Sequence, residues 1–163
     1  MTHYSHVLFL TIVISLTCSA QSLPNNQRDE AEYYARAYAQ HYHVPLPFVR
    51  AVVQQESSWR LCAVSPKGAK GLMQLMPQTA VRLGVKDRCN ANQNVSGGVR
   101  LLAWLIQEFH GDLRLVAAAY YAGENRVARR GLNYRNSDVV AYVTRLRRLY
   151  LQGTRSLDVN DEP

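Results

Sequence analysis

The chain has 163 residues, of which 47% are hydrophobic, and 19 basic residues against 12 acidic ones give a formal net charge of +7. This length suffices for one buried core and is short for two, so a single domain is expected. The positive charge favours an acidic polymer or surface as partner, although a merely soluble surface can carry the same charge. Because the basic residues are scattered, with no basic helix or aromatic-interleaved strand, nucleic acid is not expected as a partner.

The N-terminal segment has the pattern of an export signal. The first 20 residues contain no Lys, Arg, Asp or Glu, and Val7–Leu16 is almost continuously apolar. We therefore predict a signal peptide over residues 1–20, cleaved after Ala20. An uncleaved anchor is the alternative, because the positive n-region is weak, although the apolar run is short for a membrane span. Lipid attachment at Cys18 fits less well, since the residues before it make a poor lipoprotein site.

The chain contains three cysteines, of which Cys62 and Cys89 remain after cleavage. In an exported protein such an even pair is expected to form a disulfide, which would stabilise the fold by about 3 to 4 kcal/mol. Two free buried thiols are the alternative. With no paired histidines nearby the two cysteines make a weak zinc site, so we predict neither a metal nor a cofactor.

Apolar side chains recur at helical spacing from Asp29 onward, and no segment shows sustained alternation of polar and apolar residues. We therefore expect an all-α fold. The expected helices cover residues 29–42, 45–56, 77–84, 94–111, 112–122 and 137–150. Pro66, Gly68 and Gly71 indicate an irregular connection between the second and third of these helices.

Polar residues and glycines predict where the later helices start and stop. Asn94, Asp112 and Ser137 are expected to cap the helices that follow them, and Gly123 is expected to end the fifth helix. The tail over residues 153–163 is polar and expected to be loose. This leaves residues 21–152 as the folded domain.

One acidic residue stands out by its position. Glu56 follows the apolar Ala51-Val52-Val53 at the end of the second helix and precedes the irregular connection. A carboxyl group half buried at the wall of a cleft has a raised pKa, which suits a general acid working near neutral pH. The alternative is an ordinary surface glutamate exposed to solvent.

The segments around Glu56 and three later segments resemble the soluble lytic transglycosylase family. Residues 55–80 contain Gln-Glu-Ser-Ser-Trp and then Ser65-Pro-Lys-Gly-Ala-Lys-Gly-Leu-Met-Gln-Leu-Met-Pro-Gln-Thr-Ala, which is similar to the family signature. The other similar segments are Asn94-Val95 through Gly98, Ala118-Ala-Tyr-Tyr-Ala-Gly123 with Val127, and Tyr142-Val143. The resemblance covers roughly residues 30–150 and is strongest to the small enzymes that accompany type IV secretion and conjugation systems.

This resemblance implies a lysozyme-like domain that cuts the β-1,4 bond between N-acetylmuramic acid and N-acetylglucosamine without water. Glu56 would protonate the glycosidic oxygen and then, as carboxylate, take the proton of the muramoyl C6 hydroxyl, which attacks C1 to give a 1,6-anhydro end. We accordingly expect a periplasmic monomer acting on peptidoglycan strands. Secretion-system proteins would be its partners, and it would have no stable membrane insertion after signal cleavage.

The same resemblance implies contacts with the sugars for six further residues: Ser57, Ser65, Met73, Gln74, Tyr120 and Tyr142. The two tyrosines would face Glu56 across the cleft. Alternatively, Met73 and the Tyr120 ring pack in the core, and the Ser57 hydroxyl bonds to local backbone. The chain departs from the family pattern at Tyr121, where the pattern has Asn, and at Glu124-Asn125, where it has Pro-Gly.

Two other functions stay open from the sequence. A lysozyme-type hydrolase ordinarily needs a second carboxylate near Glu56, which the neighbouring sequence lacks. Folding could still bring one of four acids close: Asp87, Glu108, Asp112 or Glu124. A catalytically idle wall-binding or secretion scaffold would use the cleft only to hold glycan.

Overall fold

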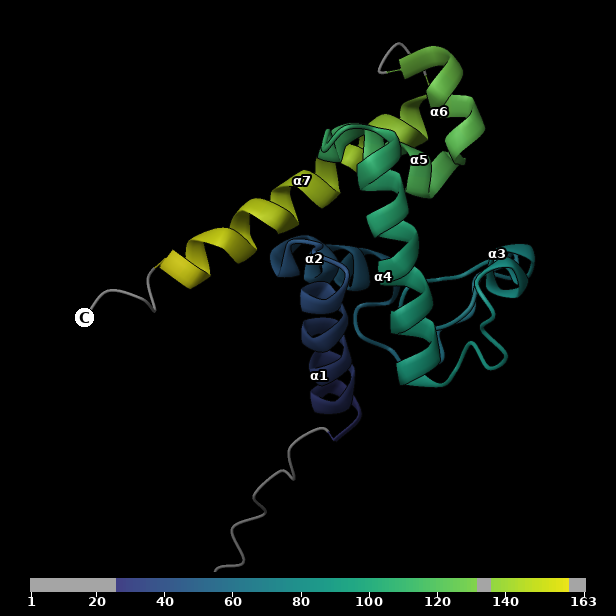
Figure 1. Ribbon diagram of the computed structural model, residues 1–163, viewed down its shortest axis with the longest axis vertical. Coiled ribbons are helices and arrows are strands. Elements are labelled where there is room, and N and C mark those ends of the chain that lie inside the picture. Colours follow the sequence, from purple (N-terminus) through teal and green to yellow (C-terminus); the bar gives the residue numbers. More distant parts are fainter. Residues whose placement is uncertain (1–25, 132–135, 159–163) are drawn as a thin grey trace, which may run out of the picture.

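The computed structural model describes residues 26–131 and 136–158 of the chain. Every regular element in these ranges is a helix, which confirms the all-α prediction. The helices are α1 (Asn26–His41), α2 (Leu46–Ser57), α3 (Pro77–Arg82), α4 (Ala91–Glu108), α5 (Leu113–Ala122), α6 (Glu124–Arg130) and α7 (Ser137–Asp158) (Figure 1). Two isolated bridges, Val64 with Lys70 and Lys70 with Leu75, shape the connection between α2 and α3. The predicted signal peptide over residues 1–20 lies outside the described residues.

The core forms around α2, the helix that carries the predicted acid. Pro45 and Pro47 open this helix, as expected for residues with a fixed φ at a helix start. Its apolar face, with Phe48, Val49 and Val52, is buried. It packs against α1 and α7, while α4 packs on α1 and α5, and α5 packs on α7 (Figure 1). This packing fixes the C-terminal end of α2 relative to α5 and α7.

The start and the end of α5 agree with the signals in the sequence. The Asp112 carboxylate accepts a hydrogen bond from the Arg114 N–H and caps the helix, and Gly123, with φ 93°, ends it. The glycine allows the chain to turn directly into α6, which is not predicted from the sequence. α6 contributes the buried Val127 to the core.

Two of the predicted helix caps are wrong. The side chain of Asn90, rather than that of Asn94, accepts a backbone N–H in the first turn of α4. The Asn136 side chain accepts two backbone N–H groups at the start of α7, the role expected for Ser137. In both places the sequence offers two polar residues that can cap, and the geometry selects the earlier one.

The last helix is longer than predicted. α7 continues to Asp158, so Gly153 lies within it and does not begin a loose tail. A Cβ atom added at Gly153 would meet Pro47 of α2 at the ordinary contact distance of 3.5 Å. Packing against α2 therefore supports the helix beyond its apolar repeat, as tertiary contacts generally do for helices.

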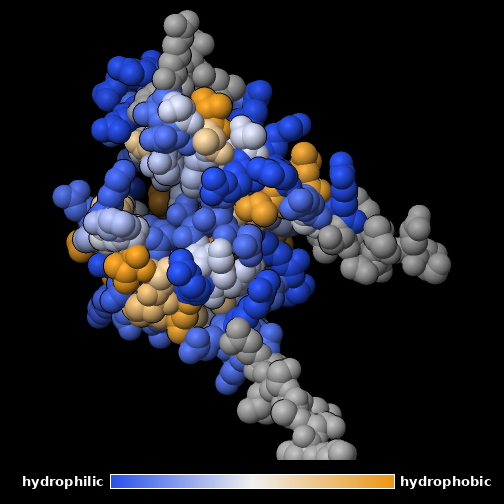
Figure 2. Space-filling view, turned by 180° about the vertical axis from the view of Figure 1, so that it is seen from behind, coloured by the Kyte–Doolittle hydropathy of each residue, from blue (hydrophilic) through white to orange (hydrophobic). Residues whose placement is uncertain are grey.

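The face of the molecule opposite to the view of Figure 1 is mainly polar. In the view from behind, hydrophilic residues cover most of the molecule, and the hydrophobic ones form small separate patches (Figure 2). Among the helices of the described ranges, none combines the length and the apolar character that a membrane span requires.

A disulfide joins Cys62, in the connection between α2 and α3, to Cys89, just before α4, as predicted. The two Cα atoms are 4.7 Å apart and the residues are separated by 27 positions in the sequence. The segment enclosed by this bond has little regular structure of its own. The cross-link therefore ties an irregular connection to the start of α4.

We predict that replacing both cysteines by serine lowers the free energy of unfolding by about 3 kcal/mol, because the unfolded chain gains the entropy that the closed loop had removed. Urea denaturation of the oxidised wild type and of the double variant measures this difference. The variant should also be insensitive to reductant, whereas the wild type should fall to the stability of the variant when reduced. Equal stability of the oxidised wild type and the variant would contradict the prediction.

Candidate active site

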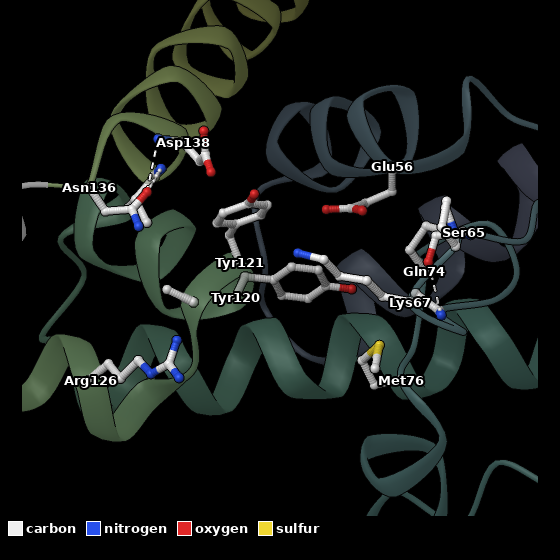
Figure 3. A pocket seen from close by; sticks show the side chains of 14 residues that line it. Glu56, Ser65, Lys67, Gln74, Met76, Tyr120, Tyr121, Arg126, Asn136 and Asp138 are labelled. Carbon is white, nitrogen blue, oxygen red and sulfur yellow. Dashed lines mark hydrogen bonds between the residues drawn. The ribbon is translucent and has the colours of Figure 1, made fainter.

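Glu56 lies in the last turn of α2, where Ser58 adopts a left-handed conformation with φ 52° and ends the helix. Its side chain is half-buried and lines a cleft (Figure 3). Burial raises the pKa of this carboxyl from 4.5 to about 7, and a hydrogen bond from Tyr142 opposes part of the rise. A substantial fraction of the molecules therefore carries a neutral Glu56 at neutral pH.

Two tyrosines approach Glu56 from α7 and α5. The Tyr142 hydroxyl donates to Glu56 Oε1 at 2.5 Å, and the Tyr120 hydroxyl donates to the backbone carbonyl of Met73 at 2.7 Å. Burial and the nearby charge of Glu56 raise the pKa of both tyrosines well above the ordinary value. Both groups therefore stay protonated, as hydrogen-bond donors, over the range in which Glu56 titrates.

The cleft has a volume of about 500 Å³. Its wall comes from α2, the α2–α3 connection, α5, α6 and the start of α7 (Figure 3). The residues expected from the sequence that line it are Glu56, Ser65, Gln74 and Tyr120. Tyr142 joins them through its bond to Glu56, so the structure brings five of the seven predicted catalytic and binding residues to one place.

Two predicted contact residues do not reach the cleft. Ser57 is buried, and its hydroxyl donates to the backbone carbonyl of Val53 at 3.1 Å. Met73 is fully buried and packs on α4, where a Cβ atom added at Gly98 would come within 2.3 Å of its sulfur. The expected sugar contacts of these two side chains are therefore replaced by local backbone bonding and core packing, the alternatives that the sequence left open.

The irregular connection between α2 and α3 is held in place by Asn94 of α4. This buried side chain accepts from the Met73 N–H at 2.8 Å and donates to the Lys70 carbonyl at 3.1 Å. Gly71, with φ 90°, lies so close that an added Cβ would stand 2.2 Å from the Asn94 amide nitrogen. Asn94 and Gly71 therefore build the cleft wall and do not line the cleft themselves.

Ser65 and Gln74 are both fixed by backbone bonds within this connection. Ser65 Oγ accepts from the Ala69 N–H at 3.0 Å. Gln74 Nε2 donates to the carbonyls of Ala63 at 2.8 Å and Gly71 at 3.0 Å. The hydroxyl proton of Ser65 and the amide oxygen of Gln74 take no part in these bonds, so a ligand in the cleft can use them.

Among the described residues, the cleft lining contains one carboxylate besides Glu56, that of Asp138 at the start of α7. Asp138 is exposed, and in the close view Tyr121 lies between it and Glu56 (Figure 3). The four acids considered from the sequence line no part of this cleft. The pKa of Glu56 is shifted by burial and by the hydrogen bond from Tyr142, and not by the charge of a second carboxylate.

Within the described residues, no three His, Cys, Asp or Glu side chains are grouped so as to hold a metal ion.

Six of the cleft-lining residues that the sequence does not predict as contacts have long or polar side chains: Lys67, Met76, Tyr121, Arg126, Asn136 and Asp138. Tyr121 was detectable only as a departure from the family pattern. Asn136 and Asp138 carry no local signal, because they reach the cleft through the packing of α7 on α5. Lys67 and Met76 lie inside the segment that resembles the family signature, where no local pattern distinguishes them from their neighbours.

The fold and the site define the class of protein: a lysozyme-like helical domain with a half-buried acid in an open cleft. The chain belongs to the Transglycosylase SLT domain family, whose model matches residues 33–142.

Two relatives share part of this domain with the chain. Membrane-bound lytic murein transglycosylase F of Thiobacillus denitrificans is 38% identical over 96 residues, which are 54% of this chain and 20% of the relative. The transglycosylase of Enterobacteria phage PRD1 is 41% identical over 85 residues, which are 52% of this chain and 32% of the relative. The chain thus matches less than a third of the length of either protein.

Solved structures support the same fold. An inactive mutant of lytic transglycosylase Slt from Pseudomonas aeruginosa superposes with a TM-score of 0.68 at 23% identity. The 70-kDa soluble lytic transglycosylase of Escherichia coli superposes with a TM-score of 0.67 at 24% identity. In both cases the match covers 77% of this chain and 24% of the other chain. The similarity therefore concerns one domain of larger proteins.

We predict that Glu56→Gln is more stable than the wild type at pH 8, by up to about 3 kcal/mol, and that this difference disappears toward pH 4. The pKa of Glu56 is about 7 in the native state, whereas the ordinary value of 4.5 applies to the unfolded chain. Between these values the native state binds more protons than the unfolded state, so wild-type stability falls as the pH rises through this window.

Urea unfolding of both proteins between pH 4 and pH 8 measures this difference. Glu108→Gln, at the exposed end of α4, is the matched control for the loss of one carboxylate. A difference between Glu56→Gln and the wild type that does not change with pH would contradict the raised pKa.

Proposed function

We propose that the chain is a peptidoglycan lytic transglycosylase in which Glu56 acts first as general acid and then as general base. The observation that carries the proposal is a half-buried carboxyl with a pKa of about 7 that lines an open cleft. Such a group can donate and accept a proton near neutral pH within one catalytic cycle. Family membership and the names of the relatives support the same reaction class.

In the first step, neutral Glu56 donates its proton to the glycosidic oxygen between N-acetylmuramic acid and N-acetylglucosamine. The bond from this oxygen to C1 breaks, the N-acetylglucosamine leaves with a free hydroxyl, and positive charge develops at C1. The substrate's own N-acetyl group stabilises this charge. The Tyr142 hydroxyl, which donates to Glu56 Oε1, stabilises the carboxylate that the step creates.

In the second step, the Glu56 carboxylate removes the proton of the muramoyl C6 hydroxyl. The C6 oxygen attacks C1 and closes the 1,6-anhydro ring. The proton returns to Glu56, so the enzyme ends the cycle in its starting state and water is not consumed. One carboxyl group therefore serves both steps, because the first step deprotonates it.

The walls of the cleft suit a glycan strand. Ser65 and Gln74 are held rigidly and keep hydrogen-bonding atoms free for sugar hydroxyl or amide groups. Tyr120 lines the cleft beside them and has its hydroxyl fixed on the Met73 carbonyl, so its ring is the part that can contact a sugar. Prepositioned groups of this kind orient a substrate at little entropic cost.

We also propose that residues 1–20 export the protein and that it works as a monomer in the periplasm, where it opens the wall for a secretion or conjugation apparatus. The resemblance to small enzymes of such systems supports this role, and the phage PRD1 transglycosylase is a related protein. Full targeting to wall sites in cells that lack the apparatus would contradict it.

The proposed reaction predicts that the mature protein, incubated with peptidoglycan in water enriched in oxygen-18, releases muropeptides with 1,6-anhydro ends that contain no solvent oxygen. Mass spectrometry of the products measures this directly. Glu56→Gln should lower the rate by at least about 100-fold, because the acid and the base are lost together. Asp138→Asn, the matched change at the second carboxylate of the cleft, should leave the product type unchanged.

Two outcomes would contradict the proposal in different ways. Reducing ends that carry oxygen-18, and that are lost in Asp138→Asn, would identify a lysozyme-type hydrolase with Asp138 as the second carboxylate. Bound glycan without any product, from a protein that is fully folded, would identify a wall-binding scaffold.

A further inference from the structure

We propose that Tyr121 is a sugar-stacking residue: its ring forms a platform in the cleft wall on which one pyranose ring of the glycan strand lies. This inference rests on the proposed glycan substrate. It names a residue that determines how the strand is placed relative to Glu56, and it concerns a position at which this chain departs from its family's pattern.

The exposure of Tyr121 is unusual for an aromatic ring in the wall of this cleft. Its side chain comes from the last turn of α5 and is 46% exposed, whereas Tyr142 is only 7% exposed. The hydroxyls of Tyr142 and Tyr120 are occupied by Glu56 and by the backbone of Met73, respectively. Among the tyrosines that the structure describes at the cleft, Tyr121 is therefore the one that presents a large part of its ring to a ligand.

Tyr142 supports the Tyr121 ring from one side. The two rings stack with their centroids 4.7 Å apart and their planes inclined by 25°. Stacking covers one face of Tyr121 and fixes the plane of its ring, while the exposed remainder lines the cleft. A flat aromatic surface that is rigid before the ligand arrives loses little entropy on binding.

The same stack ties the platform to the acid. The ring of Tyr142 stacks on the ring of Tyr121, and the Tyr142 hydroxyl donates a hydrogen bond to Glu56 Oε1. In the close view the Tyr121 ring is seen between Glu56 and Asn136 (Figure 3). A sugar lying on this ring would therefore be placed next to the bond that Glu56 is to cleave.

The chemistry of a pyranose suits this surface. The C–H groups on one face of the ring are apolar and weakly positive, and they pack against the negative face of an aromatic ring. The sugar hydroxyls at the edge then need polar partners. Asn136 offers one: its amide oxygen caps α7, and these side-chain bonds within the described residues do not use its amide nitrogen. An Asn at position 121, as in the family pattern, would offer hydrogen bonds but no stacking surface.

Binding of peptide-free N-acetylglucosamine–N-acetylmuramic acid oligosaccharides to the Glu56→Gln protein tests this inference, because that protein binds without turnover. Adding Tyr121→Ala should weaken binding about tenfold, whereas Tyr121→Phe, which keeps the ring, should bind within about twofold of the parent. Tyr33→Ala is the matched control, since Tyr33 is a 67% exposed tyrosine on α1 that does not line the cleft. It should not change the affinity.

Unchanged affinity in Tyr121→Ala would overturn the inference, and so would a loss that appears only with peptide-bearing strands, which would indicate a contact with the stem peptide. Because no turnover is needed, a loss of affinity in Tyr121→Ala would support the platform even if the wild type proved not to be a lyase. Failure of the Glu56→Gln protein to bind any glycan would overturn it.

A second readout separates stacking from support of Tyr142. With Glu56 intact, Tyr121→Ala should raise KM about tenfold and leave the pH at which kcat falls unchanged, because only sugar binding is lost. A shifted pH profile would mean that Tyr121 acts by positioning Tyr142 against Glu56, and this result would overturn the stacking role.

Discussion

A carboxyl group withdrawn from water at the end of α2 meets the hydroxyl of Tyr142, which lies 86 residues further along the chain on α7. Burial favours the neutral acid and the hydrogen bond favours the carboxylate, and their balance leaves the pKa of Glu56 at about 7. Because this contact joins α2 to α7, the packing of these two helices sets the protonation behaviour of the acid. The helical core is in this sense part of the catalytic site.

Much of the sequence that resembles the family signature builds the cleft wall without lining the cleft. Asn94 holds the backbone of the α2–α3 connection, and Gly71 fits against it where a side chain would not. Met73 fills the space above Gly98. The residues of this motif therefore indicate how the cleft wall is built as well as which side chains line the cleft. Residues that differ from the pattern, such as Tyr121, are where one member can adapt its cleft to a particular substrate.

The sequence predicted features that depend on local patterns. Helical periodicity indicated the all-α fold, the cap at Asp112 and the stop at Gly123 are correct, and the paired cysteines form their disulfide. It failed where distant contacts decide. α7 extends past Gly153 because it packs on α2, and Asp138 reaches the cleft only through the packing of α7 on α5. Burial of Met73 likewise depends on a contact with α4 that no local pattern reveals.

A substantial fraction of the molecules keeps the Glu56 carboxyl group protonated at neutral pH. NMR titration of protein labelled with carbon-13 at the glutamate side-chain carboxyls measures this most directly, with the Glu56 signal assigned by its absence in Glu56→Gln. A midpoint at about pH 7 is expected for this signal. A midpoint near the ordinary value of 4.5 would contradict it, because Glu56 would then be ionised at neutral pH and would have no proton to donate.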